Sequence, residues 1–162
     1  MAIIERYRHW YKHEQNANER MLRMLQSVPP INREDKRFQT AVDLAGHLAA
    51  CRHNWLDRIA SGGTNQVDWW PTAVPIESLG PTFECVERQW ATFLDRLDDD
   101  GLTSPFSFGS KERGQFEWPI EDLVFQLVGH TYYHRGQIAQ SVRDLGGEYL
   151  DTDYLYWQHN LG

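Results

Sequence analysis

Apolar residues recur at steps of three and four positions along four long segments of the chain, with polar residues between them. This spacing places the apolar side chains on one face of an α-helix, and that face is buried against a neighbouring element. The pattern therefore predicts four amphipathic helices, over residues 3–28, 34–60, 82–97 and 120–145.

Residues that interrupt helices lie at the ends of these segments. Prolines at 29–30 stop the first helix, because proline lacks the N–H that would continue it. Glycines at 62–63 end the second, since glycine readily adopts the left-handed conformation of a helix cap. The acidic residues and glycine at 98–101 end the third helix and are interpreted as a solvated terminus. Pro119 suits the first turn of the fourth helix.

The connections between the helices differ in length and composition. Residues 64–79 follow neither the helical nor the strand period and predict a long loop, which Trp69 and Trp70 should pin to the bundle beside a pocket. Residues 103–118 predict a short, irregular hairpin around the segment 109–114. The aromatic residues of the C-terminal tail are expected to dock on the helices.

Four long helices with one substantial crossover predict an all-α fold, a four-helix bundle. A length of 162 residues suits a single domain, residues 1–162, with a hydrophobic core of its own. Seven tryptophans, seven tyrosines and seven phenylalanines predict a packed interior, with some aromatic surface left for a pocket or a partner.

The charge of the chain excludes some partners. A net charge of −7 argues against binding of nucleic acid, which requires clustered basic residues on the protein. The sixteen basic residues are scattered among acids, so no polybasic membrane anchor is expected. The sequence shows no signal peptide and no apolar run of transmembrane length, which predicts a cytoplasmic protein.

Three histidines form the main candidate site. His130 and His134 lie four residues apart in the last predicted helix, so both imidazoles point to one side. His47 lies on the apolar face of the second helix and is the best candidate for a third ligand. The three predict a site for a divalent ion. The alternatives are a lone core histidine at His47 and a solvated face for the other pair.

Two cysteines, Cys51 and Cys85, are too few for a disulfide framework and are interpreted as buried thiols on inward helix faces. Cys51 lies one helical turn after His47, which leaves open a role as a soft fourth metal ligand beside the expected role in core packing.

A three-histidine site leaves a coordination position open for water or substrate, as catalytic sites do. Two reactions fit: hydrolysis by an activated water, or transfer of an activated thiolate to an electrophile. The sequence lacks a serine-nucleophile elbow and a phosphate-binding glycine loop. His13, Glu14, Asn18 and Asp43 are candidates for a general base, but the sequence does not fix their facing, so no catalytic residue is assigned.

Three segments of the chain resemble the DinB family, also called the DinB/YfiT-like metalloproteins. They are residues 10–22, 44–58 and 129–138, and the last, with its HxxxH pair followed by Arg-Gly-Gln-Ile, is the most specific. Many family sequences carry a further histidine one turn before this pair, where the present chain has Gln126. The resemblance runs over nearly the whole chain.

The resemblance implies a four-helix bundle, usually a homodimer, with a three-histidine site for a divalent ion at His47, His130 and His134. Nickel or zinc is expected first, with iron or manganese as alternatives. Characterised relatives include transferases and isomerases that depend on low-molecular-weight thiols such as bacillithiol or mycothiol. The resemblance therefore favours a thiol transferase acting on a small molecule, and a hydrolase is the second reaction.

Residues around the histidines receive structural interpretations. Arg135 and Gln137 are expected on helix faces other than that of His134, with Arg135 paired to an acid inside the bundle. Gly136 is expected at a close helix contact. Asn18 is a candidate to hydrogen-bond a ligand histidine, and Arg58 to form a salt bridge at a helix end.

Two readings other than an enzyme stay open. In the first, the protein is a non-catalytic metal-binding protein whose ion is structural or senses a ligand. In the second, it is a helical interaction domain whose histidines bind no ion, and its stability would then be unaffected by metal removal.

Overall fold

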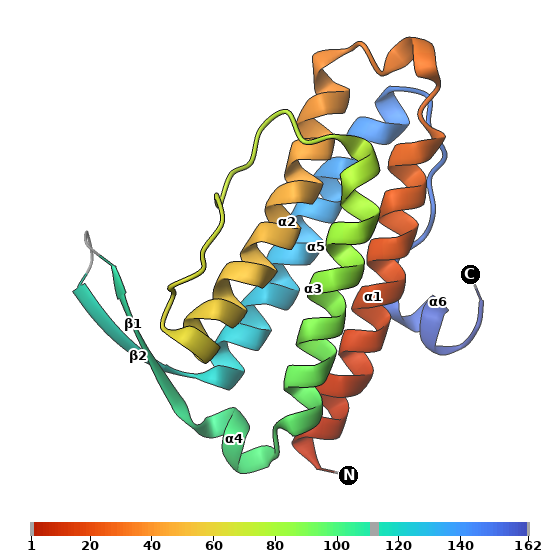
Figure 1. The fold of residues 1–162 in the computed structure, drawn as a ribbon. Coiled ribbons are helices and arrows are strands. Elements are labelled where there is room, and N and C mark those ends of the chain that lie inside the picture. Colours follow the sequence, from red (N-terminus) through yellow and green to blue (C-terminus); the bar gives the residue numbers. More distant parts are fainter. Residues whose placement is uncertain (1, 111–113, 162) are drawn as a thin grey trace.

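Four long helices form the body of the protein in a computed structural model that describes residues 2–110 and 114–161. They lie side by side as a bundle (Figure 1), which confirms the predicted all-α fold. In chain order they are α1 (Ile3–Ser27), α2 (Lys36–Ser61), α3 (Ile76–Arg96) and α5 (Ile120–Asp144). A 3-10 turn (Pro30–Asn32) joins the first two.

The main contacts between the long helices are those of α1 and of α2 with both α3 and α5. The faces that meet are those of the predicted apolar periodicity, and Met21, Leu25, Trp90 and Ile138 are fully buried between them. Burial of one such side chain contributes roughly 1.5–3 kcal/mol. Because the core involves every long helix, the bundle fixes the relative position of α2 and α5, which carry the three histidines.

The third helix begins earlier than the sequence predicts. It starts at Ile76 rather than at residue 82, so the end of the predicted loop is helical, and Pro81 lies inside the helix. Leu79 and Phe83, four residues apart, are both buried. Burial of this additional turn offsets the backbone hydrogen bond that Pro81 cannot donate.

The aspartate run is more than a solvated helix end. A short helix, α4 (Asp99–Thr103), follows Asp98, whose side chain accepts a hydrogen bond from Gly101 N at 2.8 Å. The Asp99 carboxylate accepts from the backbone N–H groups of Ile3 and Ile4, at 3.1 and 2.8 Å. Asp99 therefore caps the N-terminus of α1 from a distant part of the chain.

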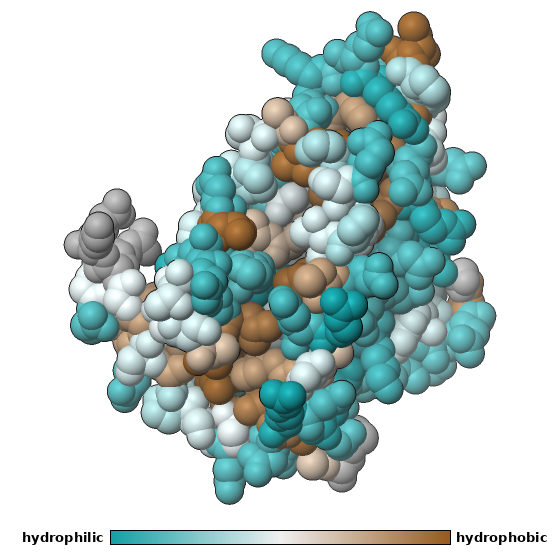
Figure 2. All heavy atoms as spheres, viewed as in Figure 1, coloured by the Kyte–Doolittle hydropathy of each residue, from teal (hydrophilic) through white to brown (hydrophobic). Residues whose placement is uncertain are grey.

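The predicted hairpin is confirmed. Strands β1 (Pro105–Ser110) and β2 (Gly114–Pro119) pair antiparallel, with Phe108 opposite Phe116, while residues 111–113 of the predicted turn lie outside the described residues. The Phe108 ring packs edge-on against Trp55 of α2, with ring centroids 5.2 Å apart. Figure 2 shows hydrophobic residues gathered over the hairpin and the neighbouring part of the bundle.

The C-terminal tail docks on α1, as predicted. It contains α6 (Tyr154–Gln158), and Gln158 Oε1 lies 2.5 Å from His9 Nε2. Arg20 donates a hydrogen bond to the Asp151 carbonyl at 3.0 Å. Together these contacts lay the tail along α1.

The cysteines differ in burial. Cys51 is buried, as expected, but Cys85 is exposed. The prediction for Cys85 was wrong. The buried face of α3 is formed by Phe83, Val86 and Trp90, and residue 85 lies on the opposite side of the helix. Within the described residues no helix combines the length and the apolar character needed to span a membrane.

Candidate metal site

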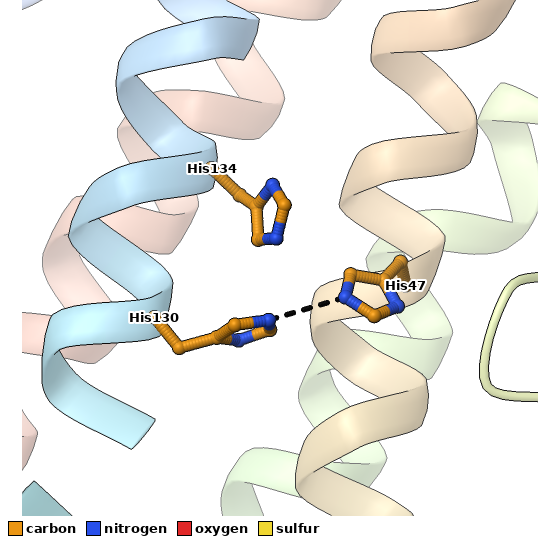
Figure 3. Close-up of side chains that lie close together, drawn as sticks. All are labelled: His47, His130 and His134. Atoms are coloured by element: carbon orange, nitrogen blue, oxygen red, sulfur yellow. Dashed lines mark hydrogen bonds between the residues drawn. The ribbon is translucent and has the colours of Figure 1, made fainter. Parts of the chain in front are cut away.

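The structure brings the three predicted histidines together. His47 lies on α2, His130 and His134 lie on α5, and the three rings turn toward one another across the α2–α5 contact (Figure 3). One ligand atom from each histidine lies within 4.8 Å of the others. His47 and His134 are buried, and His130 is half-buried.

The spacing of the ring nitrogens fits a single ion. His47 Nε2 and His130 Nε2 are 3.1 Å apart. Nitrogen ligands about 2.0–2.1 Å from a tetrahedral ion lie roughly 3.3 Å from each other. The same distance allows the hydrogen bond drawn in Figure 3, in which His130 Nε2–H donates to His47 Nε2, so the pair has a stable arrangement without an ion as well.

Two of the rings are held in the tautomer that a metal ligand requires. His47 Nδ1 lies 2.5 Å from the carbonyl oxygen of Trp69, and His134 Nδ1 lies 2.7 Å from Gln137 Oε1. Both partners are acceptors, so Nδ1 carries the hydrogen in each ring and Nε2 keeps its lone pair for an ion. The expectation that Gln137 lies on another helix face was wrong, because residues three apart are neighbours on a helix.

The loop between α2 and α3 forms one wall of the site. Besides the Trp69 carbonyl, it supplies the Trp70 ring, which stacks on His47 with centroids 3.6 Å apart and an interplanar angle of 8°. Tyr133 packs edge-on against His134 at 5.0 Å. Trp70 and Tyr133 are 60% and 65% exposed, so aromatic surface borders the histidines on the solvent side.

Burial favours the neutral form of His130 and His47. It lowers the pKa of His130 to about 4, with further lowering by His134, His47 and Arg52. Burial also lowers the pKa of His47, against the hydrogen bond to Trp69, which acts to raise it. A neutral imidazole is the form that binds a metal, so no proton has to be removed from an imidazolium near pH 7.

Cys51 does not complete the site. Its Sγ lies 3.6 Å from both ring nitrogens of His47, yet the ligating cluster in the described residues consists of the three histidines. Burial raises the pKa of the Cys51 thiol to about 12, which disfavours the thiolate that binds metals. The geometry supports the core-packing role for this residue.

None of the side chains considered as a general base hydrogen-bonds to the three histidines. Each has a partner elsewhere, and for Asn18 this overturns the expected bond to a ligand histidine. The partners are Arg52 for Glu14, Glu87 for Asn18, Thr152 for His13 and Val74 for Asp43.

Two further expectations were wrong. Arg58 forms no salt bridge within the described residues; its guanidinium lies over the rings of Trp55, Trp69 and Phe108 at 4.6, 4.7 and 5.1 Å. These contacts join the hairpin and the loop to α2, and so help to hold the Trp69 carbonyl beside His47. Gly136 permits no close helix contact, since a Cβ there would meet nothing within 4 Å.

Comparison with known proteins places this arrangement in a family. The family model described as "DinB family" matches residues 4–160. "Protein DinB" of Bacillus subtilis (strain 168) is 23% identical over 155 residues, which cover 89% of this chain and 88% of that protein. The matched region includes all three histidines, and their cluster fits a metal-binding protein. With the model matching almost from end to end, the chain belongs to the DinB family.

Proposed function

We propose that this protein is a metal-dependent enzyme that transfers a low-molecular-weight thiol to a small electrophilic substrate. His47, His130 and His134 hold a divalent ion through their Nε2 atoms. The observation that carries the proposal is the fixed tautomer of His47 and His134, because hydrogen bonds from Nδ1 to Trp69 and Gln137 direct both remaining lone pairs into the cluster.

Nickel or zinc is the proposed ion. Three neutral imidazoles are borderline donors that both ions accept, and both stand above iron and manganese in the usual order of affinity. A carboxylate would favour harder ions, and none belongs to the ligating cluster among the described residues.

The engagement of the candidate base residues favours a thiol as the nucleophile. With one coordination position free, the ion supplies Lewis acidity that lowers the pKa of a bound nucleophile. A free thiol ionises near pH 8.5, so a thiol bound to the ion would be deprotonated outright and would need no general base. The candidate base residues are engaged elsewhere, which suits the thiol reaction.

The aromatic border supplies a binding surface for the electrophile. Trp70 and Tyr133 flank the histidines and keep much of their surface exposed. Flat apolar rings of this kind bind aromatic or unsaturated carbon compounds by stacking. In the proposed reaction the thiolate sulfur bonds to the electrophilic carbon, the leaving group departs with the electron pair, and the thiol proton passes to solvent.

The first experiment is metal analysis by mass spectrometry on untagged protein. We expect about one ion per chain, lost in the variants His47→Ala, His130→Ala and His134→Ala. His9→Ala is the matched control, because His9 contacts the tail at Gln158 rather than the cluster. Equal metal content in all four variants would refute the assignment of the ligands.

The second experiment measures the reaction. Bacillithiol, mycothiol and water are offered as nucleophiles to 1-chloro-2,4-dinitrobenzene, with chloride release as the readout. We expect thiol-dependent release by the loaded enzyme and none by the His47→Ala variant. Release that depends on metal but not on thiol would instead identify a hydrolase, and no turnover by a metal-loaded protein would identify a binding protein.

We further propose that the protein acts as a cytoplasmic homodimer without nucleic-acid or membrane partners. The net charge of −7 and the exposed Cys85 thiol support this setting, since a reducing compartment keeps such a thiol free. Phe125 on α5, 73% exposed, offers apolar surface to a second copy. Sedimentation equilibrium of the wild type and a Phe125→Glu variant tests the dimer.

A further inference from the structure

Arg135 is buried and forms no direct ion pair within the described residues. Only 3% of the residue is exposed, and none of the ion pairs among the described residues includes it, so the predicted pairing with an acid was wrong. Its one hydrogen bond runs from Nη1 to Asn18 Oδ1 at 3.3 Å, while its Nε has no partner in the described part of the chain. A buried cation in this state is costly unless something else neutralises it.

The neighbouring acids supply only part of that charge. The Glu14 carboxylate, itself buried, is ion-paired with the buried Arg52. The Asn18 side-chain amide donates a hydrogen bond to Glu87 Oε1 at 2.9 Å. Burial raises the pKa of Glu87 to about 7, so this carboxyl is only partly ionised near neutral pH. The guanidinium groups of Arg52 and Arg135 therefore share the Glu14 carboxylate, and the region keeps an excess of positive charge.

A cavity of about 310 Å³ adjoins Arg135 and is lined by residues of α1, α5 and α6. Its walls are mostly apolar and aromatic, with Arg135, Glu14 and His13 as polar members. The aromatic walls are Tyr7, Trp10, Phe125, Tyr132 and Tyr154. This volume lies at the lower end of the range for small-molecule sites. The three histidines do not line the cavity, because they face α2 on the other side of α5.

We infer that this cavity binds a small carboxylic acid with an aromatic or apolar body, whose carboxylate pairs with the Arg135 guanidinium. A carboxylate matches the planar fork of a guanidinium and supplies the missing negative charge. The Tyr132 ring lies 4.8 Å from the guanidinium carbon and holds its plane, while the remaining rings accept the apolar body. This site is separate from the proposed metal chemistry and does not rest on it.

Binding is tested with phenylacetate and with phenylacetamide, a neutral molecule of nearly the same shape. Calorimetric titrations use the full-length protein stripped of metal, and the His47→Ala variant, so that the carboxylate cannot bind an ion. We expect phenylacetate to bind roughly ten- to a hundredfold more tightly than phenylacetamide, the range of one charge-assisted contact. Equal affinity for the two compounds would overturn the inference.

Arg135→Gln tests the anchor. It should lower the affinity for phenylacetate to that for phenylacetamide while leaving phenylacetamide binding unchanged. A preference for phenylacetate that persists in this variant contradicts the inference. Circular dichroism shows whether this variant folds. If it does not fold, the next two variants test the cavity with Arg135 in place.

Val128→Trp fills the aromatic cavity while Arg135 itself is unchanged, since Val128 lines the same space from α5. Gly136→Leu is the matched control: it fills an adjoining cavity that shares Arg135 and Tyr132, and its Cβ has open space. Phenylacetate binding should be lost in Val128→Trp and kept in Gly136→Leu. The reverse pattern, or binding that survives in both variants, would refute the site between α1, α5 and α6.

Discussion

The buried ion pair between Glu14 and Arg52 offers a quantitative test of the interior. The two side chains are 8% and 6% exposed, so solvent screens their interaction very little. Replacing Glu14 by Leu leaves the Arg52 guanidinium buried and unpaired, and such a loss destabilises a protein by about 3–5 kcal/mol. The rings of Tyr11 and Trp90, 5.7 and 5.2 Å from that guanidinium, offset part of this cost, by up to roughly 2 kcal/mol. We expect a net loss of about 1–5 kcal/mol.

The reciprocal change should cost less. In Arg52→Met the Glu14 carboxylate remains buried, but Arg135 is close enough for its charge to interact with it. The double variant Glu14→Leu/Arg52→Met removes both charges and should recover to within about 1–2 kcal/mol of the wild type, because two apolar groups need no partner. The expected order of stability is therefore wild type, double variant, Arg52→Met and Glu14→Leu.

Urea denaturation followed by circular dichroism gives the free energy of unfolding for each variant. A chelator is present throughout, since a bound ion would add its own stabilisation. A Glu14→Leu variant that loses less than about 1 kcal/mol, or a double variant as unstable as the sum of the two single ones, would refute the reasoning.

Three other changes probe separate features. Burial raises the pKa of Glu87 to about 7, so the wild type loses stability as the pH rises from the ordinary pKa of a glutamate to about 7. Glu87→Gln should therefore be more stable than the wild type at pH 8 and equal to it at pH 4, measured by urea denaturation. Gln137→Ala removes the acceptor of His134 Nδ1 and should weaken metal affinity about 10- to 100-fold in a competition titration, whereas unchanged affinity would show that Gln137 does not orient the ligand. Met21→Ala leaves a hole in a fully buried position and should cost about 2–5 kcal/mol by the same denaturation assay, and a smaller loss would contradict close packing there.

Periodicity was sufficient to identify the four long helices and the three histidines. The HxxxH spacing places two imidazoles on one side of α5, and the apolar neighbours of His47 place it on the buried face of α2. These features are local, since each follows from the geometry of a single helix. The meeting of the two helices needed only the further assumption that amphipathic faces pack against each other.

Contacts between distant segments were not predictable in the same way. The cap that Asp99 provides to α1 joins residues about one hundred positions apart, and no local pattern specifies it. The bond from His47 to the Trp69 carbonyl depends on the path of a loop, and the Trp69-Trp70 pair was the one signal that this loop is held in place. Leu79 likewise extends α3 across a proline through burial alone.

The helical geometry of α5 explains why the expected helix face was correct for Arg135 and wrong for Gln137. Consecutive residues on an α-helix are turned by about 100°, so Arg135 points away from His134, toward α1. Three residues correspond to about 300°, which returns Gln137 to within roughly 60° of His134 and within reach of its Nδ1. One helix can therefore serve two independent sites with neighbouring residues. Gln137→Ala should then weaken metal binding without changing phenylacetate affinity, and Arg135→Gln should do the opposite.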